Sequence, residues 1–252
     1  MKKTLFGFAL LIAIAAVAGA GEPIQDNSFL IEEAYNQEPG VVQHISVFQR
    51  GEDGNAWEYS FTQEWPFFSQ RHQLSYTLPV SHDDGTRLDG IAINYRYQVG
   101  AFDARTAVAP RISLLLGNDE SDHRRALDVN LPVSFEASER LALHSNFGAT
   151  YSRDRAGTDE DTTEIHAGQS AVWLATERFN ALLEVVWSRE ASFDSGARDY
   201  SQRVVVSPGA RWAYNMPGDL QIVPGIAFPI DLASRDEKSV LLYLSFEHPF
   251  RR

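Results

Sequence analysis

The sequence contains no cysteine among its 252 residues and very little lysine. The absence of cysteine excludes disulfide frameworks, thiolate zinc sites, cysteine nucleophiles and a lipidated N-terminus. Lysine occurs at positions 2, 3 and 238, so 19 of the 22 basic residues are arginine. Acidic residues number 34, which gives a formal net charge of −12. Such a chain repels a phosphate backbone, and we expect no nucleic-acid partner.

Long hydrophobic runs are also missing after the first twenty residues. Two lysines precede an apolar run at residues 5–17, and the small residues Ala-Gly-Ala end at Ala20. This pattern predicts a secretory signal peptide over residues 1–20 that is cleaved after Ala20, rather than a membrane anchor. Removing two of the 22 basic residues leaves 20 against 34 acidic ones, a net charge of −14. No later stretch approaches the ~20 apolar residues of a spanning helix, so a membrane crossing requires strands.

Apolar and polar residues alternate through twelve segments of the remaining chain. In one of them, every second residue from Leu127 to Phe135 is apolar, and the residues between include Asp128 and Asn130. Period-two alternation predicts strands with one apolar and one polar face. Membrane-spanning strands need about 9–11 residues, against ~5–6 in soluble proteins. The segments have 9–14 residues and cover 41–49, 56–64, 71–80, 87–99, 105–117, 126–136, 141–152, 162–175, 181–190, 200–213, 219–230 and 239–250.

The connections between these segments fall into two classes. Odd-numbered connections are mostly longer and charged, for example GEDGN after Arg50, whereas even-numbered ones mostly have four to six residues. Long loops at one end and short turns at the other are typical of outer-membrane barrels, as are aromatic residues near strand ends such as Trp65, Trp173 and Trp212. The sequence therefore predicts an all-β fold, a transmembrane antiparallel up-and-down β-barrel of about 12 strands over residues 41–252. A secreted β-sandwich or lipocalin-like barrel is the alternative.

This architecture predicts a location and its partners. We expect a protein of the bacterial outer membrane, in contact with outer-membrane lipid and lipopolysaccharide and inserted by the barrel-assembly machinery. The apolar last strand, which ends at Phe250, is similar to the C-terminal signal of such barrels, although Arg251 and Arg252 follow it.

The alternation also predicts which charged side chains face the barrel interior. Both signs are present, so the charges either form arginine–carboxylate pairs that fill the lumen or line a narrow aqueous path. The lumen-lining candidates are Glu58, Glu64, Arg96, Arg111, Asp128, Glu136, His144, Glu164, His166, Glu184, Arg203, Arg211 and Glu247.

Catalytic and metal-binding motifs are weak in this sequence. The seven histidines are scattered without HExxH spacing, and GxSxG and P-loop motifs are missing. His144 and His166 lie on strands expected to pair, which would let them meet. Ser145 alternates to the opposite face from His144 and Asn146, so these three do not form a hydrolase triad. The acidic residues 159–161 lack EF-hand spacing and are read as a solvated loop. We expect no enzyme, no cofactor and no metal.

Residues 21–40 differ from the rest of the chain. Their apolar side chains show no strand alternation, and Ser28 followed by Phe-Leu-Ile-Glu-Glu has the pattern of a short helix start. This segment either folds into the lumen as a plug or lies beneath the barrel as a tether. The plug candidates are Phe29, Leu30, Ile31 and Tyr35.

Three stretches carry a resemblance to a known family. These are residues 24–44 (IQDNSFLIEEAYNQEPGVVQH), 63–67 (QEWPF) and 71–79 (RHQLSYTLP). They resemble transporter-like outer-membrane proteins grouped with the phenol-degradation (meta-pathway) barrels. The resemblance implies a passive channel for small hydrophobic or aromatic molecules, with the cargo itself unknown. The alternatives are a closed barrel with a structural or surface-interaction role and an outer-membrane hydrolase.

Overall fold

The computed structural model describes residues 26–250 apart from 53, 103, 119–124, 154–160, 195–196 and 234–236. The expected signal peptide lies outside these residues. The described part holds no helix long and apolar enough to cross a membrane. Its strands are β1 (Val41–Gly51), β2 (Trp57–Phe67), β3 (Ser69–His82), β4 (Thr86–Leu88), β5 (Ile91–Tyr97), β6 (Thr106–Val108), β7 (Arg111–Leu116), β8 (Arg125–Ser138), β9 (Leu141–Arg153), β10 (Asp161–Thr176), β11 (Phe179–Asp194), β12 (Ala197–Trp212), β13 (Tyr214–Met216), β14 (Leu220–Ala227), β15 (Ile230–Asp231) and β16 (Ser239–Pro249).

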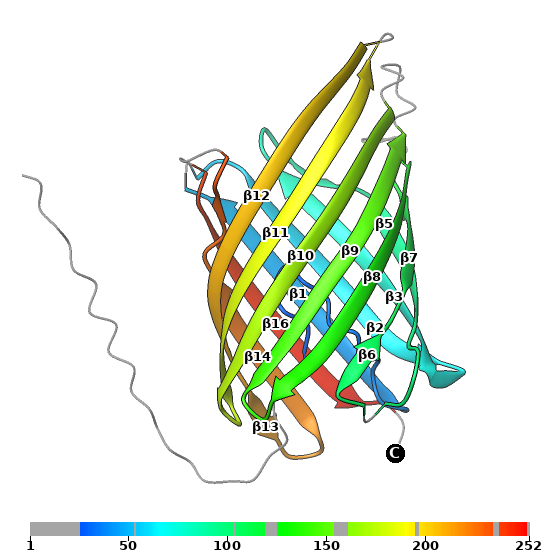
Figure 1. The fold of residues 1–252 in the computed structure, drawn as a ribbon, viewed down its shortest axis with the longest axis vertical. Helices are drawn as coiled ribbons and strands as arrows, with labels where there is room; N and C mark the ends of the chain where they lie inside the picture. Colours follow the sequence, from blue (N-terminus) through cyan, green and yellow to red (C-terminus); the bar gives the residue numbers. More distant parts are fainter. Residues whose placement is uncertain are drawn as a thin grey trace, which may run out of the picture.

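The strands form one antiparallel sheet that closes on itself (Figure 1). Apart from the four short pieces β4, β6, β13 and β15, each of the remaining twelve strands is hydrogen-bonded to the next one along the chain. The last strand, β16, pairs with the whole of β1, from Val41 opposite Pro249 to Gly51 opposite Ser239. The first and last strands therefore satisfy each other's backbone groups, which an open sheet would leave unpaired. The prediction of a 12-stranded antiparallel up-and-down barrel is confirmed.

Three of the twelve barrel strands are interrupted where the sequence predicts continuous ones. Pro110 lies between β6 and β7, and Pro229 lies between β14 and β15; neither can donate a backbone N–H to a neighbouring strand. Gly90, with a φ of 129°, separates β4 from β5. A side chain at Gly90 would collide with the Leu116 carbonyl, so glycine allows the two backbones to approach.

The two ends of the barrel differ in their connections. One end, called here the short-turn end, carries the β2–β3 turn at Phe68, the β8–β9 turn and the β10–β11 turn, and the paired residues Val41 and Pro249 lie there too (Figure 1). In outer-membrane barrels this end faces the periplasm. The loop expected at residues 191–200 is shorter than predicted, because β11 and β12 stay paired as far as Asp194 opposite Ala197.

Apolar side chains point outward and polar ones inward, the reverse of a soluble protein. On β11, Leu183 is 51% exposed and its neighbour Glu184 is 0% exposed. Trp173 and Trp212 are exposed near the short-turn end, where an aromatic belt is expected. Along the outward face of β11, the apolar residues are followed by the charged Arg189. The Arg189 guanidinium lies 4.6 Å from the centre of the Tyr200 ring. This change sets one boundary of the apolar band.

We expect Leu183→Arg to destabilise the barrel by about 2–4 kcal/mol, because it places a charge within the apolar band. Urea unfolding in lipid vesicles measures this cost. Ala191→Arg is the matched control on the same face of β11, beyond Arg189, and should cost about 0–1 kcal/mol. Equal destabilisation by both substitutions would contradict the assigned band.

Candidate functional site in the barrel interior

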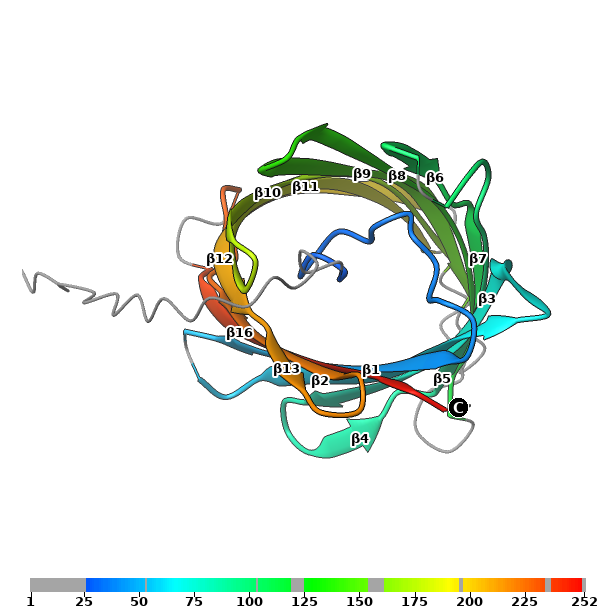
Figure 2. The same cartoon turned by 90° about the horizontal axis from the view of Figure 1, so that it is seen from below.

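The segment that precedes β1 lies inside the barrel (Figure 2). The short helix expected after Ser28 is wrong, since residues 26–40 contain bends, a turn at 39–40 and irregular backbone but no helix. Phe29, Ile31 and Ala34 are buried, with Ala34 fully inaccessible. An irregular backbone inside a barrel must find hydrogen-bond partners outside its own segment, and here the barrel wall provides most of them.

The first half of the segment is held by Arg211 and Glu184. The Nη1 atom of Arg211 donates to the backbone oxygens of Asp26 at 2.6 Å and Asn27 at 2.7 Å. The Oε1 atom of Glu184 accepts from the backbone N–H groups of Leu30 at 2.9 Å and Ile31 at 3.1 Å. An arginine therefore binds carbonyl groups and a carboxylate binds N–H groups, so charged side chains on β12 and β11 recognise the segment's backbone.

The second half is held in the same way by side chains on β5 and β9. Arg96 on β5 donates to the Tyr35 oxygen at 2.7 Å, the Glu33 oxygen at 3.1 Å and Asn36 Oδ1 at 2.8 Å. On β9, the side chain of Asn146 accepts from Glu32 N at 2.9 Å and donates to Glu32 O at 2.8 Å. The amide thus bonds both backbone groups of Glu32, as the backbone of a paired strand would.

Further amide and hydroxyl groups complete the contacts. Ser134 accepts from Ala34 N, Gln98 accepts from Asn36 N and Gln73 accepts from Gln37 N, each at 2.8 Å. These uncharged residues were absent from the sequence-based lumen candidates, which were charged or histidine. They follow the same alternation, so the inward face of each strand already indicated them.

The apolar side chains of the segment fit where wall residues lack side chains. Phe29 lies against Gly209 and Gly225, and Ile31 lies against Gly168; a Cβ atom at any of these glycines would collide with the segment. Phe29 also meets the ring of Tyr243 edge-on, with 5.4 Å between centroids. These glycines thus form recesses in the wall for two of the four predicted plug residues. Leu30 is half-buried beside Phe29, and the Tyr35 hydroxyl reaches the Ala104 carbonyl at 3.4 Å.

Asp26 lies at the beginning of the described segment and is 2% exposed. Its Oδ1 atom accepts hydrogen bonds from Tyr243 Oη at 2.6 Å and Gln43 Nε2 at 2.7 Å. Burial raises the pKa of Asp26, and the charge of Arg211 opposes that rise. Ser28 adds a hydrogen bond of 2.8 Å to Ser170 on β10.

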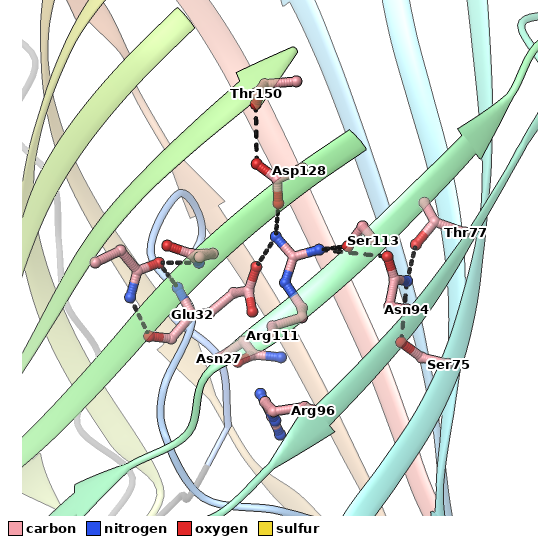
Figure 3. A network of polar contacts seen from close by, with 12 residues as sticks. Asn27, Glu32, Ser75, Thr77, Asn94, Arg96, Arg111, Ser113, Asp128 and Thr150 are labelled. Carbon is pink, nitrogen blue, oxygen red and sulfur yellow. Dashed lines mark hydrogen bonds and ion pairs between the residues drawn. The ribbon is translucent and has the colours of Figure 1, made fainter. Parts of the chain in front are cut away.

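Arg111 connects the segment to the wall through ion pairs (Figure 3). Its Nη2 atom lies 2.8 Å from Glu32 Oε1 and 2.9 Å from Asp128 Oδ2. Thr150 Oγ1 donates to the other oxygen of Asp128 at 2.9 Å, and Arg111 also donates to Asn94 and Ser113. Arginine suits this position because its planar group can bond several acceptors at once.

The structure places all thirteen lumen candidates on the inward faces of their strands, at different depths. Glu64, Arg96, His144, Glu184 and Arg211 are buried, whereas Glu58, Glu136 and Arg203 are exposed near the barrel ends. Arg111, Asp128, Glu164, His166 and Glu247 are intermediate. Their role in transport stays a prediction.

Two side-chain groupings considered from the sequence do not form. His144 is paired with Ser170 and His166 with Gly148, so the two histidines lie four residues apart along the strands and do not meet. His144 is instead 2.8 Å from Ser134 Oγ, and His166 is 3.6 Å from Glu164. Ser145 donates to Gln169 at 2.7 Å, away from the buried His144 and Asn146. Residues 159–160 of the acidic cluster lie outside the described part.

Comparisons with known proteins identify the fold. No family model and no curated protein matches the sequence. Among solved structures, the COG4313 outer membrane channel from Pseudomonas putida F1 superposes with a TM-score of 0.64 at 12% identity, covering 85% of this chain and 97% of that chain. The NanC porin gives 0.56 at 11% identity, with 81% and 98% covered. The KdgM porin gives 0.50 at 10% identity, with 84% and 99% covered. The chain therefore has the fold of outer-membrane porin-like β-barrels.

We expect Arg96→Ala to loosen the second half of the segment, because it removes three hydrogen bonds from a charged donor. A hydrogen bond to a charged group contributes about 1.5–3 kcal/mol, so losing even one should raise local opening about tenfold or more. Endoproteinase Glu-C cleavage after Glu32 and Glu33, followed by mass spectrometry on the folded barrel, measures the opening.

Arg203→Ala is the matched control. This arginine also lies on an inward face, but it pairs with Asp231 at 2.8 Å near the other end of β12. Cleavage in this variant should remain as slow as in the parent protein. Faster cleavage in Arg203→Ala than in Arg96→Ala would contradict the assigned contacts.

Proposed function

We propose that this protein is an outer-membrane channel for small molecules whose lumen is closed at rest by residues 26–40, called here the plug segment. The main support is that the plug segment separates two cavities. Residues 27–32 line a cavity of about 190 Å³, while Glu33 and Tyr35 line another of about 270 Å³ that reaches Glu139 and Leu174 at the short-turn end. A molecule crossing the barrel would have to displace or bypass the segment between them.

The nature of the hydrogen bonds also supports a displaceable plug. The contacts reported above join plug backbone to single wall side chains, not to the continuous backbone of a neighbouring strand. A side chain released from the segment can turn to water, so opening leaves the closed sheet intact. We infer that the segment moves as a unit while the barrel keeps its twelve strands.

The walls of the smaller cavity favour a particular cargo. Ile45, Val47 and Tyr243 supply apolar surface, and Thr62, Thr77 and Asn94 supply hydrogen-bonding groups. Such a mixture suits a small molecule with an apolar body and a few polar groups. The family resemblance over residues 24–80 points the same way, toward hydrophobic or aromatic compounds. Lipopolysaccharide and the barrel-assembly machinery are the partners we propose, and cleavage after Ala20 the export step.

The rival proposal is a closed barrel with a structural or surface role. It is favoured by the ion pairs of Arg111, which join β7, β8 and the plug segment. The two proposals differ in one measurable property, because a plugged channel conducts when the segment is released and a closed barrel does not. The arrangement of His144, Ser145 and Asn146 gives no support to a hydrolase.

A redox-controlled lock tests the plug. Ser28 and Ser170 lie with their Oγ atoms 2.8 Å apart, and the natural chain has no cysteine, so Ser28→Cys with Ser170→Cys should form one defined disulfide. In planar bilayers, the oxidised double variant should stay closed, and reduction should restore the channel openings of the parent protein. Deletion of residues 21–38 should raise conductance while heat-modifiable gel mobility still reports a folded barrel.

The single variant Ser28→Cys is the control and should not respond to the redox change. A folded deletion variant that stays silent would support the closed barrel instead. Conductance through the oxidised lock equal to that of the parent protein would show that ions pass without release of the segment, and the plug proposal would fail.

A further inference from the structure

The cavity on the short-turn side of the plug segment has a chemical character of its own. Three carboxylates line it, those of Glu33, Glu136 and Glu139. Glu33 comes from the plug segment, and the other two come from the end of β8 and the turn that follows. Arg211 contributes positive charge to the lining, and its Nη1 atom already donates to two carbonyl groups of the segment. The lining therefore carries an excess of negative charge.

Glu33 is the informative member of this group. The residue is 7% exposed, yet within the described part of the chain its carboxylate has no hydrogen-bond or ion-pair partner; Arg96 contacts its backbone oxygen instead. Buried carboxylates are normally paired, since burying an unpaired charge is costly. Burial raises the pKa of Glu33 to about 7, with Asp26 and Glu64 adding to the rise and Arg211 and Arg96 opposing it. A cation in the cavity would supply the missing partner.

The remaining walls of the cavity are suited to an apolar body. Val172 and Leu174 line one side, and Tyr35 offers an aromatic ring beside Glu33. An aromatic face attracts a cation and also packs against hydrocarbon. Arg105, which lies nearby, donates to the backbone oxygens of Glu136 and Ala137, so its charge is directed to carbonyl groups. The cavity volume of about 270 Å³ limits the occupant to a small molecule.

We propose that this cavity binds a small organic cation, an ammonium group carried on an apolar body. The ammonium group lies among the carboxylates of Glu33, Glu136 and Glu139, and the apolar part packs against Val172, Leu174 and Tyr35. The site needs the plug segment in place, because the segment contributes Glu33 and Tyr35. The proposal goes beyond channel function, since a barrel that never conducts can still bind the ligand.

Isothermal titration of the folded, untagged, full-length barrel in detergent tests this proposal. The probe is 2-phenylethylamine, compared with neutral 2-phenylethanol and anionic phenylacetate after subtraction of titrations into empty micelles. We expect the amine to bind, and the alcohol and the carboxylate to bind at least about tenfold more weakly. A tenfold loss of affinity corresponds to losing a charge interaction equivalent to one pKa unit. Equal affinity for all three compounds would overturn the proposal.

Variants then locate the site. Glu33→Gln should weaken amine binding about tenfold, because it removes the buried charge and keeps the shape. Glu58→Gln is the matched control, since Glu58 also lies on an inward face but near the long-loop end of β2. If Glu33→Gln does not fold, the double variant Glu136→Gln/Glu139→Gln changes only exposed residues and must weaken binding instead. Unchanged affinity in a folded Glu33→Gln barrel, or in this double variant, would overturn the proposal.

The pH dependence gives a second readout. Glu33 is mostly ionised at pH 8 and mostly protonated at pH 6, whereas the amine is cationic at both, so binding should weaken by up to about tenfold at the lower pH. His144, Glu136 and Glu139 also line the cavity, so the variant Glu33→Gln is needed to assign the pH dependence of binding. If Glu33 causes that dependence, Glu33→Gln must remove most of it. A pH response unchanged in that variant, or a titration signal with CaCl2 and none with the amine, would count against the organic-cation site.

Discussion

Closure of the sheet is the constraint on which the rest of this structure depends. A strand that crosses a bilayer cannot leave backbone N–H or C=O groups unpaired, and the pairing of β1 with β16 satisfies the two strands that would otherwise be edges. Because strand side chains alternate, closure also divides them into an outer set and an inner set. Leu183 and Glu184 are adjacent in the chain, yet one belongs to the surface of the barrel and the other to its interior.

The polar interior in turn makes it possible to bury an irregular segment. Residues 26–40 form neither helix nor strand, so their backbone groups depend on partners from the wall. Arginine, glutamate, asparagine, glutamine and serine side chains on six different barrel strands provide them: Arg96, Arg211, Glu184, Asn146, Gln73, Gln98 and Ser134. The same residues would be costly in an apolar core, and here they hold the segment by many separate contacts.

Charge is distributed unevenly along this interior. Arg111 forms ion pairs with both Glu32 and Asp128 beside the smaller cavity, and Arg203 pairs with Asp231 near the long-loop end. Toward the short turns, Glu33 is buried, and among the described residues its carboxylate has no hydrogen-bond or ion-pair partner. The interior therefore differs in character on the two sides of the plug segment, which is the basis for assigning different roles to the two cavities.

Local alternation of apolar and polar residues was enough to predict the barrel and the face on which each side chain lies. Alternation such as that of Leu127 to Phe135 reports local strand geometry, which needs no knowledge of distant residues, and it predicted all twelve barrel strands to within a few residues. Tertiary structure alone decided which inward residues meet. His144 and His166 share a face but are separated by the register of β9 and β10, and Asn146 and Ser134 find the plug segment only because of where it enters. Register and the path of an irregular segment depend on contacts between residues far apart in the chain, and a local pattern carries no information about those contacts.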